Sequence, residues 1–367
     1  MRFTVDTQEM NSAISTVIKA LPSKSSMAIL EGIYIEARES DVLLKCTDLS
    51  LQIETVIGAI IEYEGKTVIP GRVFSDMMRK MPGETTSFDF EDKKVIIKSG
   101  RAKTAMKTEN SDDYHDMPKV KNTTSFSIET SKFRNMIKQC IFATAQDDTK
   151  PILTGVLLEV EKDSLTMVAL DGYRLAMRKE SISKCTGEEK VVIPYKSLLE
   201  IGKTLTDGEE EITINISKTS VNIDLGYTVV TTRLLEGDFI KYKNILPSSH
   251  LTRVRLKREE LAQSIERVSI ISREEKTNLI SLSFENDMLT ITANSELGRS
   301  NEEIEADIIG EDIKIAFNSK YMSDVVKSLD DEEIYLEMNN NISPCIIKPT
   351  EGDKFYYLVL PVRHFSE

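Results

Sequence analysis

The chain has 367 residues, a formal net charge of −13, 29% charged residues, 6% aromatic residues and no Trp. This length exceeds one ordinary core, because domains average roughly 150 residues, so we expect about three domains. The acidic composition by itself argues against a nucleic-acid binder, and the four scattered cysteines, which include no CxxC pair, argue against a zinc site.

The start of the chain and its hydropathy also limit where the protein works. Met1 opens no signal peptide, and no apolar run approaches the roughly 18 residues of a membrane span. The cysteines fit reduced thiols in a reducing compartment. We therefore expect a cytoplasmic protein that makes no membrane contact.

One pattern recurs along the chain at a fixed step. The segment Ile29–Ile33 recurs as Ile152–Val156, a shift of 152 − 29 = 123 residues, and a fainter third version begins at Asn278. A period of this length predicts three similar domains and not a solenoid, whose repeats are about 20–50 residues. We call the three segments copy one, copy two and copy three.

A second signal repeats with nearly the same step and helps to place the boundaries. A strand-like run ends at Pro70 and again at Pro194, and Asn318 opens the third version. Polar stretches near residues 121–124 and 247–249 precede a new copy, as loops between domains do. We therefore expect domains at residues 1–121, 122–248 and 249–367.

Each copy is expected to begin with a short alternating strand and an amphipathic helix, and to carry a second helix after the Pro or Asn signal. Met10, Ile14 and Val17 have the spacing of three and four that puts one apolar stripe on a helix. The predicted helices cover residues 8–20, 72–81, 130–144, 196–205, 257–273 and 319–328. Alternating runs such as residues 212–216 predict antiparallel hairpins between them. The fold class is therefore α+β, with a layer of helices against antiparallel sheet in each domain.

Charge is distributed unevenly over these elements. The six predicted helices hold 15 Lys or Arg against 7 Asp or Glu, a net of +8, which leaves −13 − 8 = −21 for the rest of the chain. If the copies surround a common centre, the basic helices would line it with positive charge. Such a lining binds phosphates without reading bases, which lets the protein slide along DNA. The alternative is that each basic helix face is ordinary solvated surface. The residues expected to face DNA are Arg72, Arg79, Lys80, Arg134, Lys138, Lys196, Lys203, Lys320 and Lys327.

A second charge asymmetry concerns assembly. Residues 93–107 carry six basic and no acidic side chains, whereas residues 302–312 carry six acidic ones. Opposite charges in copy one and copy three suit a head-to-tail contact, which closes a ring if the rotation permits. The alternative is two solvated edge strands whose charges prevent aggregation.

Motifs for chemistry are weak. Two Gly-Lys-Thr tripeptides, at residues 65–67 and 202–204, lack the preceding glycine of a phosphate-binding loop. The three histidines have no metal-binding or catalytic spacing, and Asp171 with Gly172 predicts a hairpin turn. We therefore expect neither an enzyme nor a cofactor.

Several stretches resemble the bacterial sliding clamps, the beta subunits of DNA polymerase III, over essentially the whole chain. They are Phe3–Val5, Leu170–Ala176, Arg233–Phe239, Tyr242 with Ile245–Pro247, Phe317–Asn318 with Tyr321, and Leu360–Arg363. The resemblance implies a homodimeric ring of three clamp domains per chain, with helices inside and sheets outside, that encircles duplex DNA. It also implies binding of the DNA polymerase III catalytic subunit, the clamp loader and other proteins with clamp-binding motifs. The alternative is a peptide-binding repeat scaffold that does not encircle DNA.

The resemblance further implies site residues. Its deep peptide pocket corresponds to Leu153, Leu170, Gly172, Tyr173, Arg174, Leu175, Ile240, Ile245, Leu358 and Leu360, and its shallower groove to Asn318, Tyr321, Ile342, Pro344 and Arg363. A pocket with aliphatic walls and a few polar groups suits an apolar anchor. Tyr173 and Ile240 stand where other members often have His and Pro, so the peptide preference stays open.

Three further assignments follow from the same resemblance. Copy one has Thr47–Ser50 where copy two has Leu170–Tyr173, so we expect one pocket per chain. Lys24 occupies a loop position that touches DNA in the family. Met106 is expected on one side of the dimer interface, and Ile270 and Ile271 on the other.

Overall fold

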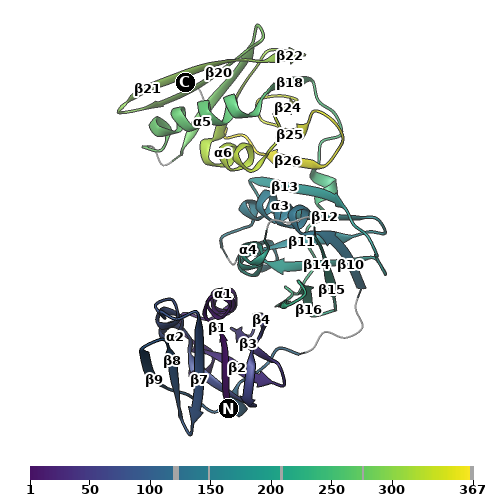
Figure 1. Ribbon diagram of the computed structural model, residues 1–367. Helices are drawn as coiled ribbons and strands as arrows, with labels where there is room; N and C mark the ends of the chain where they lie inside the picture. The colour runs from purple at the N-terminus through teal and green to yellow at the C-terminus, as the bar shows by residue number, and fades with distance from the viewer. Residues whose placement is uncertain (119–123, 148, 207–209, 275–276, 364–367) are drawn as a thin grey trace. The chain divides into compact units, whose positions relative to one another are not determined.

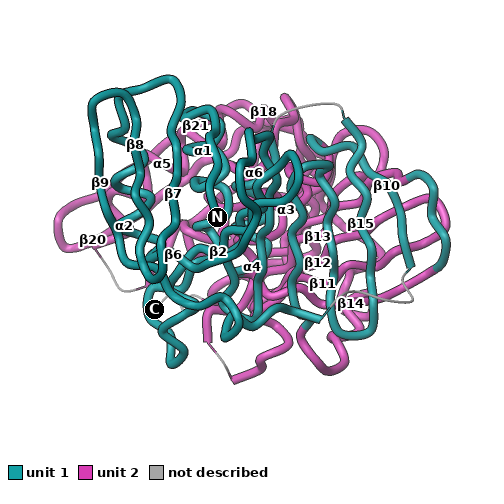
Figure 2. Tube along the Cα trace, turned by 60° about the horizontal axis from the view of Figure 1, so that its bottom comes forward, with its two compact units in different colours: residues 1–131, 183–187, 196–234 teal, residues 132–182, 188–195, 235–367 magenta. Residues whose placement is uncertain are grey.

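The computed structural model describes residues 1–118, 124–147, 149–206, 210–274 and 277–363. Their contacts form two compact units, which Figure 2 shows in separate colours. The first unit comprises residues 1–131, 183–187 and 196–234, and the second comprises residues 132–182, 188–195 and 235–367. The predicted boundary between residues 121 and 122 lies outside the described residues.

The first unit holds two antiparallel sheets. In spatial order, the five-stranded sheet consists of β5 (Ile60–Tyr63), β1 (Arg2–Asp6), β7 (Thr85–Glu91), β8 (Lys94–Ser99) and β9 (Ala102–Lys107). The eight-stranded sheet consists of β10 (Thr124–Glu129), β15 (Glu211–Ile216), β16 (Ser220–Asp224), β17 (Thr228–Arg233), β4 (Leu51–Gly58), β3 (Asp41–Thr47), β2 (Gly32–Arg38) and β6 (Gly65–Pro70).

The second unit also holds two antiparallel sheets. The nine-stranded sheet consists of β14 (Glu189–Pro194), β11 (Gly155–Val160), β12 (Ser164–Leu170), β13 (Arg174–Ser181), β26 (Phe355–Val359), β25 (Cys345–Pro349), β24 (Glu333–Met338), β18 (Thr252–Lys257) and β22 (Asp307–Ile309). The four-stranded sheet consists of β21 (Gly298–Glu305), β20 (Met288–Ser295), β19 (Leu279–Glu285) and β23 (Ile313–Asn318).

Each of the two large sheets extends over two copies. Strand β4 of copy one pairs with β17 of copy two, and β13 of copy two pairs with β26 of copy three. A strand at the edge of one copy offers unpaired backbone groups, and the neighbouring copy supplies the matching strand. The copies are therefore joined by continuous hydrogen-bonded sheets.

Six α-helices lie in the described part of the chain, two in each copy, as Figure 1 shows. They are α1 (Thr7–Val17), α2 (Gly71–Met78), α3 (Thr130–Cys140), α4 (Tyr195–Thr204), α5 (Arg258–Ser272) and α6 (Ser319–Ser328). The carboxylate of Asp6 caps α1 by accepting the backbone N–H groups of Gln8 and Glu9. Asn318 caps α6 in the same way. The predicted helices are confirmed, with ends shifted by a few residues.

The helices bury the apolar stripes that the sequence indicated. Met10, Ile14 and Val17 of α1 are buried, and so are Leu261, Ile265 and Val268, which have the same spacing of three and four on α5. Leu199 of α4 is an exception, because 41% of it is exposed.

The repeated sequence signals pair with each other in space. Gly32 lies opposite Pro70, Gly155 lies opposite Pro194, and in copy three Leu279 lies opposite Asn318. A Cβ on Gly155 would stand 2.7 Å from the carbonyl oxygen of Ile193, so the strands approach too closely there for a larger residue. In each copy, therefore, the two repeated motifs lie on two strands that pair with each other.

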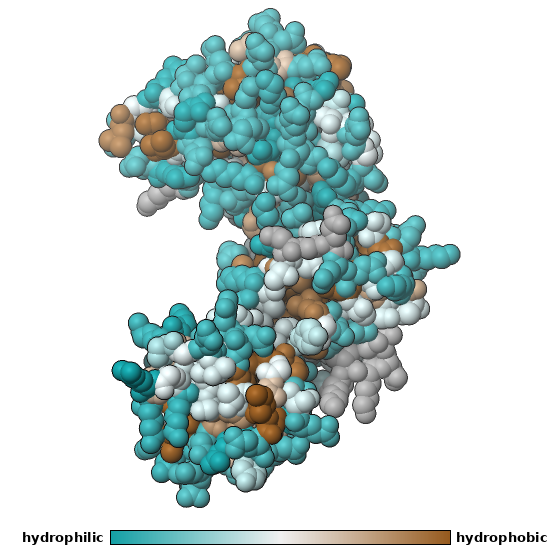
Figure 3. All heavy atoms as spheres, in the orientation of Figure 1, coloured by the Kyte–Doolittle hydropathy of each residue, from teal (hydrophilic) through white to brown (hydrophobic). Residues whose placement is uncertain are grey.

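The surface in Figure 3 is mostly hydrophilic, with hydrophobic residues in separate small groups. Among the described residues, no helix combines the length and the apolar character that a membrane crossing demands.

Candidate peptide-binding site

The predicted hairpin turn at Asp171 and Gly172 joins β12 to β13 in the second unit. Oδ1 of Asp171 accepts the backbone N–H groups of Tyr173 and Arg174, at 2.9 and 3.0 Å. Gly172 has a φ of +92°, a left-handed conformation that glycine adopts without strain. The turn therefore fixes the backbone from which Tyr173 and Arg174 project.

Four neighbouring strands bring a row of aliphatic side chains together beside this turn. Leu175 of β13 lies opposite Leu170 on β12 and opposite Leu358 on β26, and Leu358 lies opposite Ile346 on β25. With Leu153 these residues belong to one buried cluster, which we call the leucine cluster. Only 1% of Leu175 and 4% of Leu358 are exposed, so these leucines of the predicted deep pocket form core in the isolated chain.

Several of the predicted pocket residues are exposed, and we call Tyr173, Ile240, Ile245 and Ile342, together with Leu360, the rim. Tyr173 is 60% exposed, Ile240 37%, Ile245 47% and Ile342 60%. Leu360 is half-buried and packs against the cluster. Of the remaining predicted residues, Gly172 and Arg363 are exposed, and Asn318, Tyr321 and Pro344 are half-buried.

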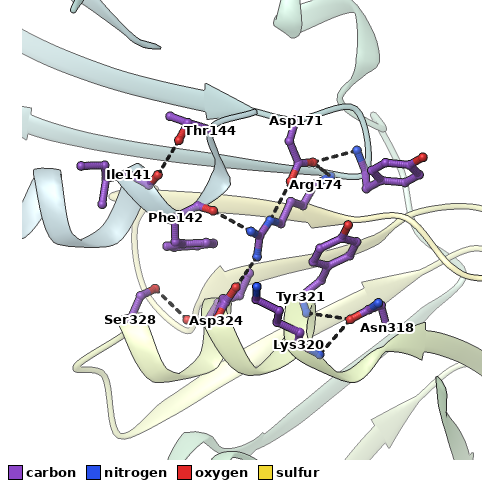
Figure 4. Close-up of polar contacts among 12 residues, drawn as sticks. Ile141, Phe142, Thr144, Asp171, Arg174, Asn318, Lys320, Tyr321, Asp324 and Ser328 are labelled. Carbon is purple, nitrogen blue, oxygen red and sulfur yellow. Dashed lines mark hydrogen bonds and ion pairs between the residues drawn. The ribbon is translucent and has the colours of Figure 1, made fainter. Parts of the chain in front are cut away.

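Arg174 is buried and holds two copies together at the site (Figure 4). Its Nε donates to Asp171 at 3.0 Å, Nη1 donates to Asp324 at 2.6 Å, and Nη2 donates to the carbonyl oxygen of Phe142 at 2.6 Å. Charge-assisted bonds of this kind are stronger than neutral ones. Arg174 therefore acts as a support for the site, and its bonds tie the hairpin turn to α6.

Aromatic rings complete this support. The Arg174 guanidinium lies 4.6 Å from the ring centroid of Tyr321, and Tyr321 stacks on Tyr173 with centroids 6.0 Å apart. Burial, followed by the charge of Asp171, raises the pKa of Tyr321, so its hydroxyl remains a donor at neutral pH. The stack presents one exposed aromatic face beside the aliphatic rim.

A buried acid fixes the segment that carries Ile240 and Ile245. The hydroxyl of Tyr242, in the short 3-10 helix η6 (Tyr242–Ile245), donates to the carboxylate of Glu159 on β11. Lys190 pairs with the same carboxylate at 2.6 Å and Lys243 at 3.5 Å. Burial alone would raise the pKa of Glu159, but the bonds from Lys190 and Tyr242 outweigh it and lower that pKa.

Copy one repeats the turn but not its surroundings. Oδ1 of Asp48 accepts the N–H groups of Ser50 and Leu51, as Asp171 does in copy two. Lys45 is buried there, pairs with Asp116 and places its ammonium 4.3 Å from the ring centroid of Tyr34. In copy one, a buried charged group thus lies in the region that corresponds to the leucine cluster of copy two.

The residues predicted to face DNA are exposed, apart from half-buried Arg134; most lie on helices, whereas Arg79 and Lys80 follow the end of α2 and Lys24 lies in a loop. Four of them already have acidic partners: Arg79 pairs with Asp76, Lys138 with Asp330, Lys203 with Glu200 and Lys327 with Glu266. Exposed pairs of this kind contribute about 0–1 kcal/mol, so phosphate groups can replace the acids.

The residues predicted at the dimer interface lie near free sheet edges. Met106 is half-buried on β9, the last strand of the five-stranded sheet. Ile270 is 63% exposed on α5, and Ile271 beside it is half-buried. Helix α5 packs against β21, the last strand of the four-stranded sheet.

Sequence reasoning missed the residues that hold the site in place. Asp324 and Phe142 accept bonds from Arg174, and Glu159 accepts a bond from Tyr242, in each case across a long stretch of sequence. Only Glu159, an acid within an apolar strand-like run, had a local signal. The described residues contain no group of three or more His, Cys, Asp or Glu arranged to hold a metal ion.

Comparisons with known proteins agree along the whole chain. Family models of the DNA polymerase III beta subunit match in three parts: the N-terminal domain at residues 1–118, the central domain at residues 127–241 and the C-terminal domain at residues 243–363. The beta sliding clamp of Staphylococcus aureus is 31% identical over 376 residues and is covered completely, as is this chain.

Solved structures give the same result. The DNA polymerase sliding clamp of Bacillus subtilis is 32% identical, with a TM-score of 0.96 and 100% of both chains covered. The DNA polymerase III beta subunit of Thermotoga maritima is 30% identical, with a TM-score of 0.92 and 99% of both chains covered.

Proposed function

Because the chain belongs to the DNA polymerase III beta subunit family, it is a DNA sliding clamp built from three clamp domains, and we propose that two copies close into a ring. The ring encircles duplex DNA and tethers the replicative polymerase, so it acts as a processivity factor in the cytoplasm and not as an enzyme. The full-length match to sliding clamps is the observation that carries this function. We propose domain boundaries near residues 121 and 248.

The basic helix faces support a DNA contact without base readout. Lys196 and Lys320 project from exposed positions and have no acidic partner within the described part of the chain. Contacts to phosphate carry no sequence information, so a protein held only by them can slide.

Two free strand edges support the head-to-tail dimer. Lys103 and Lys107 lie on the exposed side of β9, and Glu303 and Glu305 lie on the exposed side of β21. Pairing β9 of one protomer with β21 of its partner would satisfy both edges and bring opposite charges together. Met106 and Ile271 lie close enough to these strands to supply the apolar part of the contact.

The rim and the leucine cluster support a site for short peptides from the polymerase, the clamp loader and other clients. Exposed Ile245 and half-buried Leu360 offer apolar contact, and the Tyr173–Tyr321 stack adds an aromatic face. A peptide with an aliphatic and an aromatic anchor suits this surface, because such anchors carry most of the affinity of an interface.

Primer extension on circular single-stranded DNA tests the function as a whole. With a clamp loader and a DNA polymerase III catalytic subunit, we expect the chain to lengthen the products made in one binding event. The alternative, a peptide-binding scaffold without DNA encirclement, predicts products of unchanged length. The match to sliding clamps over the whole chain favours the first outcome.

A further inference from the structure

A hollow of about 380 Å³ lies on one face of the nine-stranded sheet, and none of the residues predicted for the peptide pocket lines it. Strands β12, β13, β25 and β26 form its floor, and Tyr242 and Lys243 of η6 form one wall. Met177 and Tyr356 on the floor face each other in register. We call this feature the lysine hollow, because Lys179, Lys243 and Lys348 line it.

The lysine hollow continues the sheet face that carries the leucine cluster. Alternate residues of a strand share a face, so Met177 and Lys179 follow Leu175 on β13, and Tyr356 shares that face with Leu358 on β26. Steps of two residues span about 7 Å, which places the hollow roughly 7–13 Å along the sheet from the cluster. An extended peptide covers that distance with about two to four residues.

Two polar groups in the lysine hollow lack a partner among the described residues. The half-buried ammonium of Lys179 pairs with no carboxylate there. The hydroxyl of Tyr356 is buried and makes no hydrogen bond. Burial, with the charge of Glu337 adding to it, raises the pKa of Tyr356 to about 12, so the hydroxyl keeps its proton at neutral pH. Each of the two groups can therefore donate a hydrogen bond to a ligand.

The other two lysines share their acids with further cations. Lys348 pairs with Glu337 at 2.8 Å, but Arg253 meets the same carboxylate at 2.7 Å. Lys243 lies 3.5 Å from Glu159, which also has a closer bond from Lys190. Each acid is thus neutralised by another cation, and positive charge remains around the hollow.

The surroundings favour a single carboxylate over a nucleic acid. Exposed Glu161 and Asp353 also line the hollow, and they would repel a chain of phosphates. One carboxylate on a short apolar stem would fit between them, because its stem would lie against Met177 and the ring of Tyr356 while its oxygens accept from Lys179 and the Tyr356 hydroxyl.

We propose that the lysine hollow binds an Asp or Glu side chain carried by a client peptide close to the apolar anchor that contacts the rim. This inference rests on the peptide site proposed above and extends it, because the hollow would select clients by an acidic residue outside the apolar motif.

Fluorescence anisotropy with paired peptides tests the proposal. The probe is a fluorescein-labelled peptide with a leucine and a phenylalanine as anchors, and it carries Glu or Gln at each position within about four residues of them on either side. At one or two positions, the Glu peptide should bind about 3- to 10-fold tighter than its Gln partner. Added salt should reduce that preference.

Variants of the chain connect the preference to the hollow. In Lys179→Gln, the ratio of the affinities for the Glu and Gln peptides should fall below about twofold, while the Gln peptide binds as before. Tyr356→Phe should lower the same ratio in part. Lys162→Gln is the matched control, because Lys162 is an exposed lysine in the turn between β11 and β12 and does not line the hollow.

The outcomes separate this proposal from the peptide site itself. If Gln peptides bind but no position favours Glu, or if the preference survives in both Lys179→Gln and Tyr356→Phe, the lysine hollow is not a carboxylate site and the peptide site stands. If Lys179→Gln weakens retention on circular DNA and leaves the peptide preference intact, the hollow serves phosphates and the proposal is wrong. If no peptide of either series binds, both proposals fail.

Discussion

A substitution at Ile245 of the rim can weaken peptide binding without disturbing the fold, because 47% of Ile245 is exposed. Burying a whole Ile side chain contributes about 1.5–3 kcal/mol, so the half that a peptide covers contributes about 1 kcal/mol. An Asp at this position also places a charge in an apolar contact, which costs about 1–3 kcal/mol more. Ile245→Asp should therefore weaken peptide binding by about 30-fold or more.

Anisotropy with a leucine- and phenylalanine-containing peptide measures this loss, and thermal unfolding followed by circular dichroism measures the fold. Leu297→Asp is the matched control, because Leu297 is 73% exposed in the turn between β20 and β21, outside the site. We expect both variants to melt like the unchanged protein and only Ile245→Asp to lose the peptide. Peptide affinity within about threefold of the unchanged protein in Ile245→Asp would refute the assignment of the rim.

Leu175→Asp is a poorer test of the same site. Only 1% of Leu175 is exposed, so a charge there would lie in the core and destabilise the fold by several kcal/mol. Loss of peptide binding in that variant would not separate unfolding from a lost contact. Half-buried Leu360 is more useful, because Leu360→Ala removes apolar contact and should weaken the peptide by roughly 1–3 kcal/mol.

Three further predictions concern assembly, DNA and pH. Replacing Ile270 and Ile271 together by Ala should yield monomers by light scattering, because each buried aliphatic contributes about 1.5–3 kcal/mol; a dimer at low concentration would show that the interface lies elsewhere. In Lys320→Gln, the slope of log binding constant against log salt concentration should become shallower by about 0.9, whatever the DNA sequence. An unchanged slope would show that Lys320 does not contact DNA. The lowered pKa of Glu159 stabilises the fold above the unfolded pKa of about 4.3, and this stability disappears as pH falls through the folded pKa. Glu159→Gln should therefore have a lower melting temperature than the unchanged protein near neutral pH, and the difference in melting temperature should shrink toward about pH 3. A difference that stays constant with pH would contradict this reasoning.

Local patterns in the sequence predict the elements and their repetition well. The alternation in residues 212–216 becomes β15, and the repeated signals at Gly32 and Pro70 become partners across β2 and β6. These features depend on neighbours within one copy, so the spacing of residues in one chain segment is enough to find them.

Features that join distant segments could not be read from the pattern. The pairing of β4 with β17 depends on which strand of copy two meets the free edge of copy one, and no local signal encodes that choice. The partner of Lys138 is Asp330, which lies 192 residues away. The burial of Leu170, Leu175 and Leu358 likewise depends on the pairing of strands from copy two and copy three.

Encirclement of DNA is the central claim, and covalent closure of the ring tests it most directly. Half-buried Cys185 is first replaced by Ser, since the other cysteines are buried. Cysteines are then placed at exposed Lys103 and Glu303 and joined by a bismaleimide after a clamp loader has placed the protein on a nicked circular plasmid. A closed ring should stay on the plasmid through a denaturing wash and leave when a restriction enzyme cuts the DNA. Loss of the cross-linked protein from intact circles, or its retention on cut DNA, would contradict encirclement.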